Sequence, residues 1–187
     1  AAGQAQGVAR PAVRRQDLTG IAVSANFKAH EAAELRVRPM QPRDLRAVMA
    51  IESRSYDFPW TEGIFRDCLR VGYYCQVLES DEGIVGYGIL SLGAGEAHIL
   101  NLCVKPDLRG QGLGRRMLGH LMDYARRHRA GAAVLEVRRS NHPAQELYKK
   151  AGFEQAGVRK NYYPAYGGRE DALVFINRMG NPAPKES

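Results

Sequence analysis

The stretch "RGQGLG", Arg109–Gly114, places three glycines within six residues. Glycines allow a backbone to close on an anion, and the first N–H groups of a helix have no partner within it. Two familiar phosphate loops do not fit this spacing. The dinucleotide fingerprint G-x-G-x-x-G fails because position 115 is arginine, and a P-loop fails because no lysine follows. An anion site and a plain glycine-rich turn both remain compatible with these six residues.

The flanking residues favour the anion site. Leu113, Met117, Leu121 and Ala125 recur every four residues, which predicts a long amphipathic helix directly after the glycines. A strand is predicted at 97–104, so the loop would join a strand to a helix start, where the helix dipole attracts negative charge. The chain carries a net charge of +7, and residues 105–129 hold seven Lys or Arg against two Asp. This pattern indicates an anionic ligand, although a solvated helix face also explains the arginines after residue 125.

Hydrophobic periodicity and turn signals predict the other elements. A strand with alternating Leu35 and Val37 is followed by one helix beginning near Pro42, with Leu45, Val48 and Met49 on its apolar face. Thr61 is expected to cap a second helix, whose inward face is Ile64, Phe65, Cys68 and Leu69. Short turns between strands at 73–79, 84–92 and 97–104 predict an antiparallel meander. A strand at 132–137, a helix from Asn141 to Gly152, and strands near 158–163 and 172–176 complete the pattern.

The resulting order, βαα–βββ–α–β–α–ββ, indicates one α+β domain over residues 34–178. Residues 1–33 are predicted to be a flexible N-terminal extension, and residues 179–187 a C-terminal tail. The composition, 44% hydrophobic and 25% charged, is that of a globular protein, and no apolar run approaches a membrane span. The three cysteines form no CxxC motif, and the histidines lack metal-ligand spacing. We expect a cytoplasmic protein without a metal.

Two motifs together resemble the GNAT N-acetyltransferase superfamily. Arg109, Gly112 and Gly114 fit its [QR]-x-x-G-x-[GA] signature, whose loop holds the pyrophosphate of acetyl-CoA. The segment "NHPAQELYKKAGF", residues 141–153, is similar to the helix that follows in that superfamily. The resemblance covers about residues 34–178. It implies a GNAT fold, with a mixed, mostly antiparallel central sheet flanked by helices, and acetyl-CoA as co-substrate without a metal.

Four further stretches narrow the resemblance. "FPW" (58–60), "LEVR" (135–138), "NYYP" (161–164) and "GREDA" (168–172) are similar to GNAT enzymes that acetylate the N-terminal alanine of a small-subunit ribosomal protein. The implied partner is that ribosomal protein's N-terminus, with no membrane and no need for direct nucleic-acid binding. The implied acetyl-CoA-binding residues are Leu102, Cys103, Val104, Gly110, Gln111, Gly112, Leu113, Gly114, Arg115 and Asn141.

Acetyl transfer to an amine needs a neutral amine, a donor for the carbonyl oxygen and a protonated leaving thiol. An α-amine is roughly a tenth neutral at pH 7, whereas a lysine side chain is neutral about once in two thousand. Glu136, the acid in an apolar strand, is the candidate base, and the resemblance implies the same role. A structural ion pair with Arg138 or a neighbouring strand is the alternative. Tyr148 is the candidate acid for the leaving thiolate, against the alternative of a core aromatic.

Three further residues have weaker assignments. Trp60 and Tyr163 are expected on the substrate side, although core packing explains either residue equally well. Cys103 is considered as an acyl-carrying nucleophile, but no histidine motif surrounds it. His98, five positions away on the same strand, should face the opposite side of the sheet. We therefore expect Cys103 to be a small, buried hydrophobic residue.

The sequence leads to one functional expectation and two rivals. We expect transfer of an acetyl group from acetyl-CoA to a protein N-terminus, by direct attack in a ternary complex. A GNAT enzyme acting on a small-molecule amine or a lysine side chain is the first rival. A non-catalytic, basic ribosome- or RNA-binding module is the second, and it would show salt-sensitive RNA affinity without turnover.

Overall fold

The computed structural model describes residues 35–180. The N-terminal extension expected at 1–33 lies outside the described residues, as does the predicted tail after Gly180. The elements follow the predicted order. They are β1 (Arg36–Pro39), the 3-10 helix η1 (Pro42–Asp44), α1 (Leu45–Ser55), α2 (Glu62–Arg70), β2 (Tyr74–Ser80), β3 (Gly83–Gly93), β4 (Glu96–Val104), the 3-10 helix η2 (Pro106–Leu108), α3 (Leu113–Arg127), β5 (Ala132–Arg138), α4 (His142–Lys150), β6 (Glu154–Ala165) and β7 (Gly168–Arg178).

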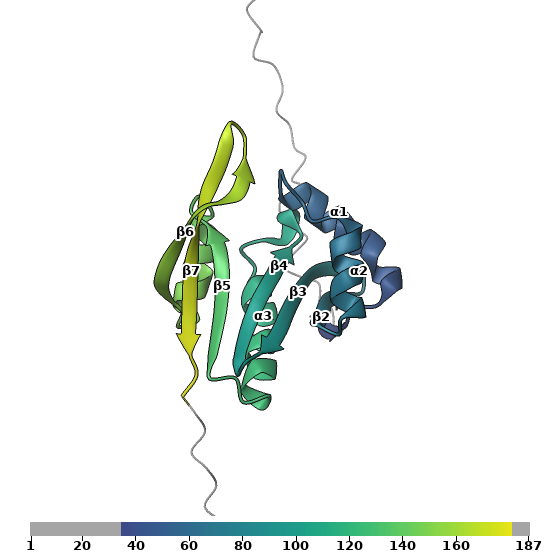
Figure 1. The fold of residues 1–187 in the computed structure, drawn as a ribbon. Helices are drawn as coiled ribbons and strands as arrows, with labels where there is room; N and C mark the ends of the chain where they lie inside the picture. Colours follow the sequence, from purple (N-terminus) through teal and green to yellow (C-terminus); the bar gives the residue numbers. More distant parts are fainter. Residues whose placement is uncertain (1–34, 181–187) are drawn as a thin grey trace, which may run out of the picture. The chain divides into compact units, whose positions relative to one another are not determined.

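The strands form one seven-stranded sheet in the order β1-β2-β3-β4-β5-β7-β6 (Figure 1). Neighbouring strands run antiparallel except at the centre, where β4 and β5 are parallel. The expected meander is confirmed as β2–β3–β4, and the last two strands form a hairpin. The fold is therefore α+β with a mixed, mostly antiparallel sheet, as the sequence predicted.

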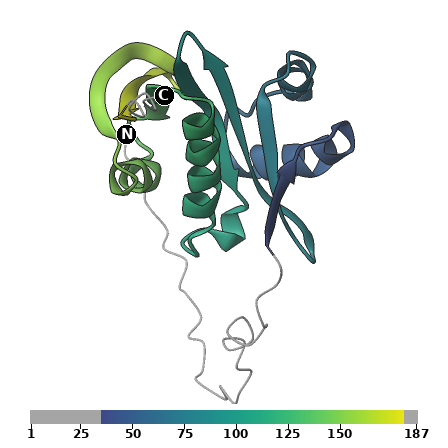
Figure 2. The same ribbon diagram turned by 90° about the horizontal axis from the view of Figure 1, so that it is seen from below.

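The sheet separates two buried clusters. Helices α1 and α2 cover one face, where Val48, Phe65, Tyr87 and Cys103 belong to one cluster. Helix α3 covers the other face together with α4, and Met117 belongs to that second cluster. Figure 2 shows α3 on the opposite side of the central strands from α1 and α2. Residues Leu113, Met117, Leu121 and Ala125, which defined the predicted helix, are all buried.

Two details of α2 differ from the prediction. Ile64 is 41% exposed, whereas Phe65 and Cys68 are buried, so the inward face of the helix is narrower than its apolar residues suggested. Thr61 does occupy the N-cap position, but its side chain makes no capping hydrogen bond. Its backbone carbonyl accepts from the N–H of Ile64 at 3.1 Å instead. The helix starts at the predicted place without side-chain capping.

An ion-pair network ties the first strand to the rest of the domain. Arg38 on β1 donates to the carboxylates of Asp44, at 2.7 Å, and Glu79, at 2.8 Å. Hydrogen bonds from Arg38 and Arg36 lower the pKa of Glu79 to about 2. Since Asp44 also accepts from the backbone of Gln41, the network links β1, η1 and β2. It fixes the chain just ahead of α1, which supplies part of the site described below.

The sheet and α3 approach closely at Gly88. A Cβ at this position would lie 3.0 Å from side-chain atoms of both Leu121 and Met117. Contacts this short are rare for a real Cβ, so the absence of a side chain sets the distance between β3 and α3.

We expect Gly88→Val to destabilise the protein by about 1–3 kcal/mol, because it overpacks this contact. Gly93→Val is the matched control. It lies on the same strand, where an added Cβ meets nothing within 4 Å, and its effect should stay within about 0.5 kcal/mol. Urea unfolding of the two variants measures the difference. Equal stabilities would refute this close contact between β3 and α3.

Candidate active site

The central strands part within the sheet. Strand β4 pairs with β5 from Glu96–Ala132 to Ile99–Leu135, and beyond that point the two strands diverge (Figure 1). A bulge in β4 accompanies the divergence. Ile89 opposes Asn101 and Leu90 opposes Ile99, so Leu100 is an extra residue. The following residues of β4 pair with β3 on one side and leave their other edge free of β5.

Two cavities meet where the strands part. The larger has a volume of about 630 Å³ and extends along the glycine loop and the start of α3. The smaller, about 270 Å³, lies beside β5 and the loop after α1. The residues that line both are Tyr56, Phe58, Leu102, Arg138, Asn141, Ala144 and Pro164. Two ligands, one bound in each cavity, would therefore meet at β4.

The glycine loop gives the larger cavity the character of an anion site. Gly110 has φ of +79° and Gly112 φ of +83°, a left-handed backbone that favours glycine. An added Cβ at either position would meet no atom within 4 Å, so the space beside the loop is open. Gly112 is the N-cap of α3, and Arg115 in the first turn also lines the cavity. Unpaired N–H groups, the helix dipole and this guanidinium all favour a phosphate.

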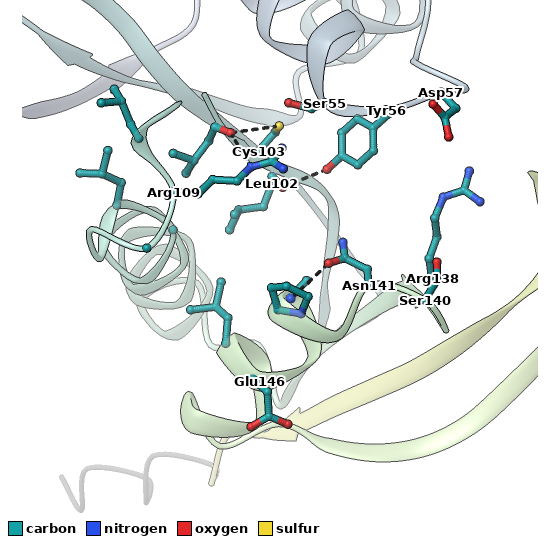
Figure 3. Close-up of a pocket in the computed structure, with 18 of the residues that line it drawn as sticks. Ser55, Tyr56, Asp57, Leu102, Cys103, Arg109, Arg138, Ser140, Asn141 and Glu146 are labelled. Atoms are coloured by element: carbon teal, nitrogen blue, oxygen red, sulfur yellow. Dashed lines mark hydrogen bonds between the residues drawn. The ribbon is translucent and has the colours of Figure 1, made fainter. Parts of the chain in front are cut away.

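Nine of the ten residues predicted to bind acetyl-CoA line the larger cavity. Gln111 is the exception: this exposed residue of the loop is not part of the cavity wall. Asn141 has its predicted capping role, since its side chain accepts from the N–H of Ala144 at 3.3 Å. It also points toward Tyr56 across the cavity (Figure 3).

The side chain of Arg109 points back toward β4. Its Nε donates to the carbonyl of Val104 at 3.2 Å (Figure 3). The signature arginine therefore fastens the beginning of the loop to the end of the strand while also lining the larger cavity.

The position of His98 relative to Cys103 differs from the prediction. His98 was expected on the opposite side of the sheet, but the extra residue Leu100 reverses the alternation between them. Cys103 pairs with Tyr87 and His98 with Ser91, two positions on the same side of β3, so the cysteine and the histidine share a face. His98 approaches Glu96 at 3.5 Å and is 44% exposed, while Cys103 is buried. The expectation of a small buried residue at 103 agrees with this burial.

Glu136 lies on the wall of the smaller cavity with its side chain 21% exposed. Its carboxylate forms an ion pair with Arg159 on β6 at 3.3 Å, while Arg138 pairs with Glu170. Neither partner considered from the sequence is the one observed, because β7 separates β6 from β5 in the sheet. Tyr163 also contacts Glu136, since its hydroxyl donates to the Glu136 backbone carbonyl at 3.1 Å.

Tyr148 lines the same cavity from α4 and is 7% exposed. Burial raises its pKa to about 12, and the neighbouring Cys103 thiol adds to the effect. Its hydroxyl is therefore protonated throughout the physiological range. The remaining two predicted residues, Trp60 and Tyr163, line this cavity as well. Burial, followed by the charge of Glu136, raises the pKa of Tyr163 above its ordinary value.

Sequence reasoning missed residues at the end of α1. The hydroxyl of Tyr56 donates to the carbonyl of Leu102 at 3.5 Å, and burial raises the pKa of this phenol well above its ordinary value. Phe58 and Tyr166 place their rings 5.4 Å apart and join the α1–α2 loop to the β6–β7 hairpin. Glu52 lines the smaller cavity from α1. The sequence did contain a signal for Glu52: this acidic residue lies seven positions after Leu45, on the apolar face of the helix.

Two kinds of feature are absent from residues 35–180. None of the helices in this range is long and apolar enough to cross a membrane. The range also contains no cluster of three His, Cys, Asp or Glu side chains arranged to hold a metal ion.

Comparison with known proteins adds independent information. The model of the acetyltransferase (GNAT) family matches residues 43–153. The [ribosomal protein bS18]-alanine N-acetyltransferase of Escherichia coli K12 is 37% identical over 139 residues, which are 74% of this chain and 94% of that enzyme. A putative enzyme of the same description from Bacillus subtilis is 40% identical over 141 residues, 74% of this chain and 92% of that protein.

Solved structures agree with this result. The crystal structure of the ribosomal-protein-S18-alanine N-acetyltransferase from Escherichia coli has a TM-score of 0.75 at 33% identity, covering 82% of this chain and 99% of that one. Naa20 of Chaetomium thermophilum, solved with a bisubstrate analogue, has a TM-score of 0.70 at 26% identity, covering 77% and 86%. Together with the parted strands and the glycine loop, these matches establish that the chain belongs to the GNAT acetyltransferase family and resembles its RimI members, the ribosomal-protein-alanine N-acetyltransferases.

Proposed function

We propose that the protein transfers an acetyl group from acetyl-CoA to the N-terminal α-amine of a protein, the acceptor being the N-terminal alanine of ribosomal protein bS18. The observation that carries the proposal is the meeting of two different cavities at the parted strands. One has the features of a phosphate site, and the other contains a carboxylate and a buried phenol. The RimI-like relatives carry this activity in their names. A newly made ribosomal protein as acceptor places the reaction in the cytoplasm.

The larger cavity fits the acetyl donor. Its length runs from the glycine loop to Leu102 and Cys103 on β4, so a phosphate bound at α3 could extend an arm toward the smaller cavity. The free edge of β4 offers backbone groups to the amides of that arm, in the manner of an added strand. In this proposal Gly110, Gly112 and Arg115 hold the pyrophosphate, and Leu102–Val104 hold the arm and the thioester carbonyl.

The smaller cavity fits the acceptor amine. Glu136, held at the wall by Arg159, accepts a proton from the amine, directly or through water. An α-amine is suited to this base, because roughly a tenth of it is already neutral at pH 7. Trp60 and Tyr163 form the walls that orient the peptide.

Tyr148 supplies the proton that the departing thiolate needs. Its pKa of about 12 keeps the phenol protonated until transfer. A thiol ordinarily has a pKa near 8.5, so the transfer runs uphill in water. Burial offsets part of the difference, since a thiolate leaving into the same dry environment also gains proton affinity.

The first prediction concerns the acceptor. A peptide that begins with free alanine should gain one acetyl group on its α-amine, and the same peptide with a blocked N-terminus should gain none. Intact-mass analysis after incubation with acetyl-CoA measures both. Acetylation of internal lysines at a comparable rate would instead favour a lysine or small-amine enzyme, and RNA affinity without any turnover would favour a binding module.

The second prediction concerns the glycine loop. Gly112→Asp should weaken acetyl-CoA binding much more than Gly112→Asn, because the two side chains have the same size and both tolerate a left-handed backbone. They differ in the negative charge placed beside the pyrophosphate. The difference should shrink as salt is raised, because salt screens the charge. Calorimetry at two ionic strengths tests this, and equal affinities for the two folded variants would refute the phosphate site.

The third prediction separates the base from the acid. Glu136→Gln should lower turnover by roughly 10² to 10⁴ near neutral pH. The deficit should shrink above pH 8, where the amine supplies its own neutral form. Tyr148→Phe removes a proton donor that high pH does not replace, so its deficit should persist at pH 9. Identical pH–rate profiles, each normalised to wild type, would contradict this division of roles.

A further inference from the structure

Glu52 is a buried carboxylate outside the proposed catalytic pair. It lies on α1 and is 1% exposed. Its Oε1 accepts from the backbone N–H of Trp60 at 2.8 Å, and its Oε2 accepts from the hydroxyl of Tyr87. The two partners come from the α1–α2 loop and from β3, so Glu52 also anchors that loop to the sheet. Both hydrogen bonds come from uncharged donors.

Buried carboxylates in proteins are normally paired with a cation, because an isolated charge loses its hydration. Across residues 35–180, Glu52 forms no ion pair with a Lys, Arg or His side chain, whereas Glu136 and Glu170 both do. A carboxylate also has about four acceptor sites, of which the two hydrogen bonds use two. Among the described residues, Glu52 therefore has no cationic partner, and its carboxylate has acceptor sites left for another group.

Glu52 is also one of the residues that line the smaller cavity, as are Glu136 and Tyr148. The cation that enters this cavity in the proposed reaction is the acceptor's own α-ammonium, since most of an α-amine is protonated at pH 7. We propose that Glu52 binds this ammonium group and is a substrate-binding residue of the acceptor cavity. This inference rests on the proposed function.

The assignment gives the two carboxylates different tasks. Glu52 attracts the protonated amine into the cavity, and Glu136 then takes its proton, which leaves the nitrogen lone pair free to attack the acetyl carbonyl. A neighbouring negative charge stabilises the ammonium form and therefore raises the pKa of the bound amine. Glu52 consequently strengthens binding while opposing deprotonation, so its loss should affect KM and the pH profile in a recognisable way.

Other titratable or charged groups face Glu52 or the cavity that it lines. They are Tyr87 on β3, Tyr56 after α1, Cys103 on β4, Tyr148 on α4, Glu136 and Arg138 on β5, and Tyr163 on β6. The phenols stay neutral, since burial raises the pKa of Tyr56, Tyr87 and Tyr148. Arg138 is held by Glu170 at 3.1 Å.

Glu52→Gln removes the charge while its amide can still accept from Trp60 and donate to Tyr87. With the alanine peptide, we expect KM to rise roughly 10- to 100-fold, the range for a hydrogen bond to a charged group. The acid limb of the kcat profile, which reports groups in the enzyme–substrate complex, should move about one pH unit or more lower. The Kd of acetyl-CoA, measured by calorimetry, should stay at the wild-type value.

Tyr87→Phe is the matched control, because it deletes a hydrogen-bond partner of Glu52 and leaves the charge. It should lower the melting temperature while keeping the wild-type KM and pH profile. Wild-type values for Glu52→Gln, or equal changes in both variants, would show that Glu52 is a loop anchor alone and overturn the inference. Failure of the wild-type protein to acetylate the peptide would overturn the proposed function itself.

Discussion

The pairing of β4 with β5 ends at Ile99–Leu135, and the site depends on that early end. Had the two strands paired along their full length, the free edge of β4 and the junction of the cavities would be closed. The extra residue Leu100 lies at the point of divergence, and both cavities are lined by residues that follow it. A local irregularity in the hydrogen-bond ladder thus coincides with the junction of the two cavities in an otherwise continuous sheet.

The two sides of this opening differ in charge. Glycine N–H groups, the start of α3 and Arg115 face the larger cavity, whereas Glu52 and Glu136 face the smaller one. In the proposed reaction a polyanionic donor would be drawn to the glycine loop and a cationic amine to the two carboxylates, while Arg138 lines both cavities. Arg54 and Asp107 form an exposed ion pair at 3.2 Å, which connects the end of α1 to η2 just ahead of the glycine loop.

The parts of the fold that follow local rules could be predicted. The four-residue apolar repeat gave α3, and the cap at Asn141 gave the start of α4. Predictions failed where three-dimensional context decides. The side of the sheet on which His98 lies depends on a bulge that no residue type announces. The exposure of Ile64 depends on how α1 and α2 pack, and so does the burial of Glu52, which sequence reasoning missed. Resemblance to a family located the candidate site residues, but the ion pair of Glu136 with Arg159 required the structure.

The bulge at Leu100 also affects how this chain can vary in length. Loops of a domain commonly accept inserted or deleted residues, because their side chains are not committed to a face. In β4 the loss of Leu100 would restore simple alternation, and every later residue would keep its partner on β3 and its side of the sheet. The loss of Leu102, after the bulge, would instead move Cys103 to the α3 side and Val104 to the α1 side, so each would enter the wrong buried cluster. Along this strand a change in residue count can therefore be absorbed at the bulge but not beyond it.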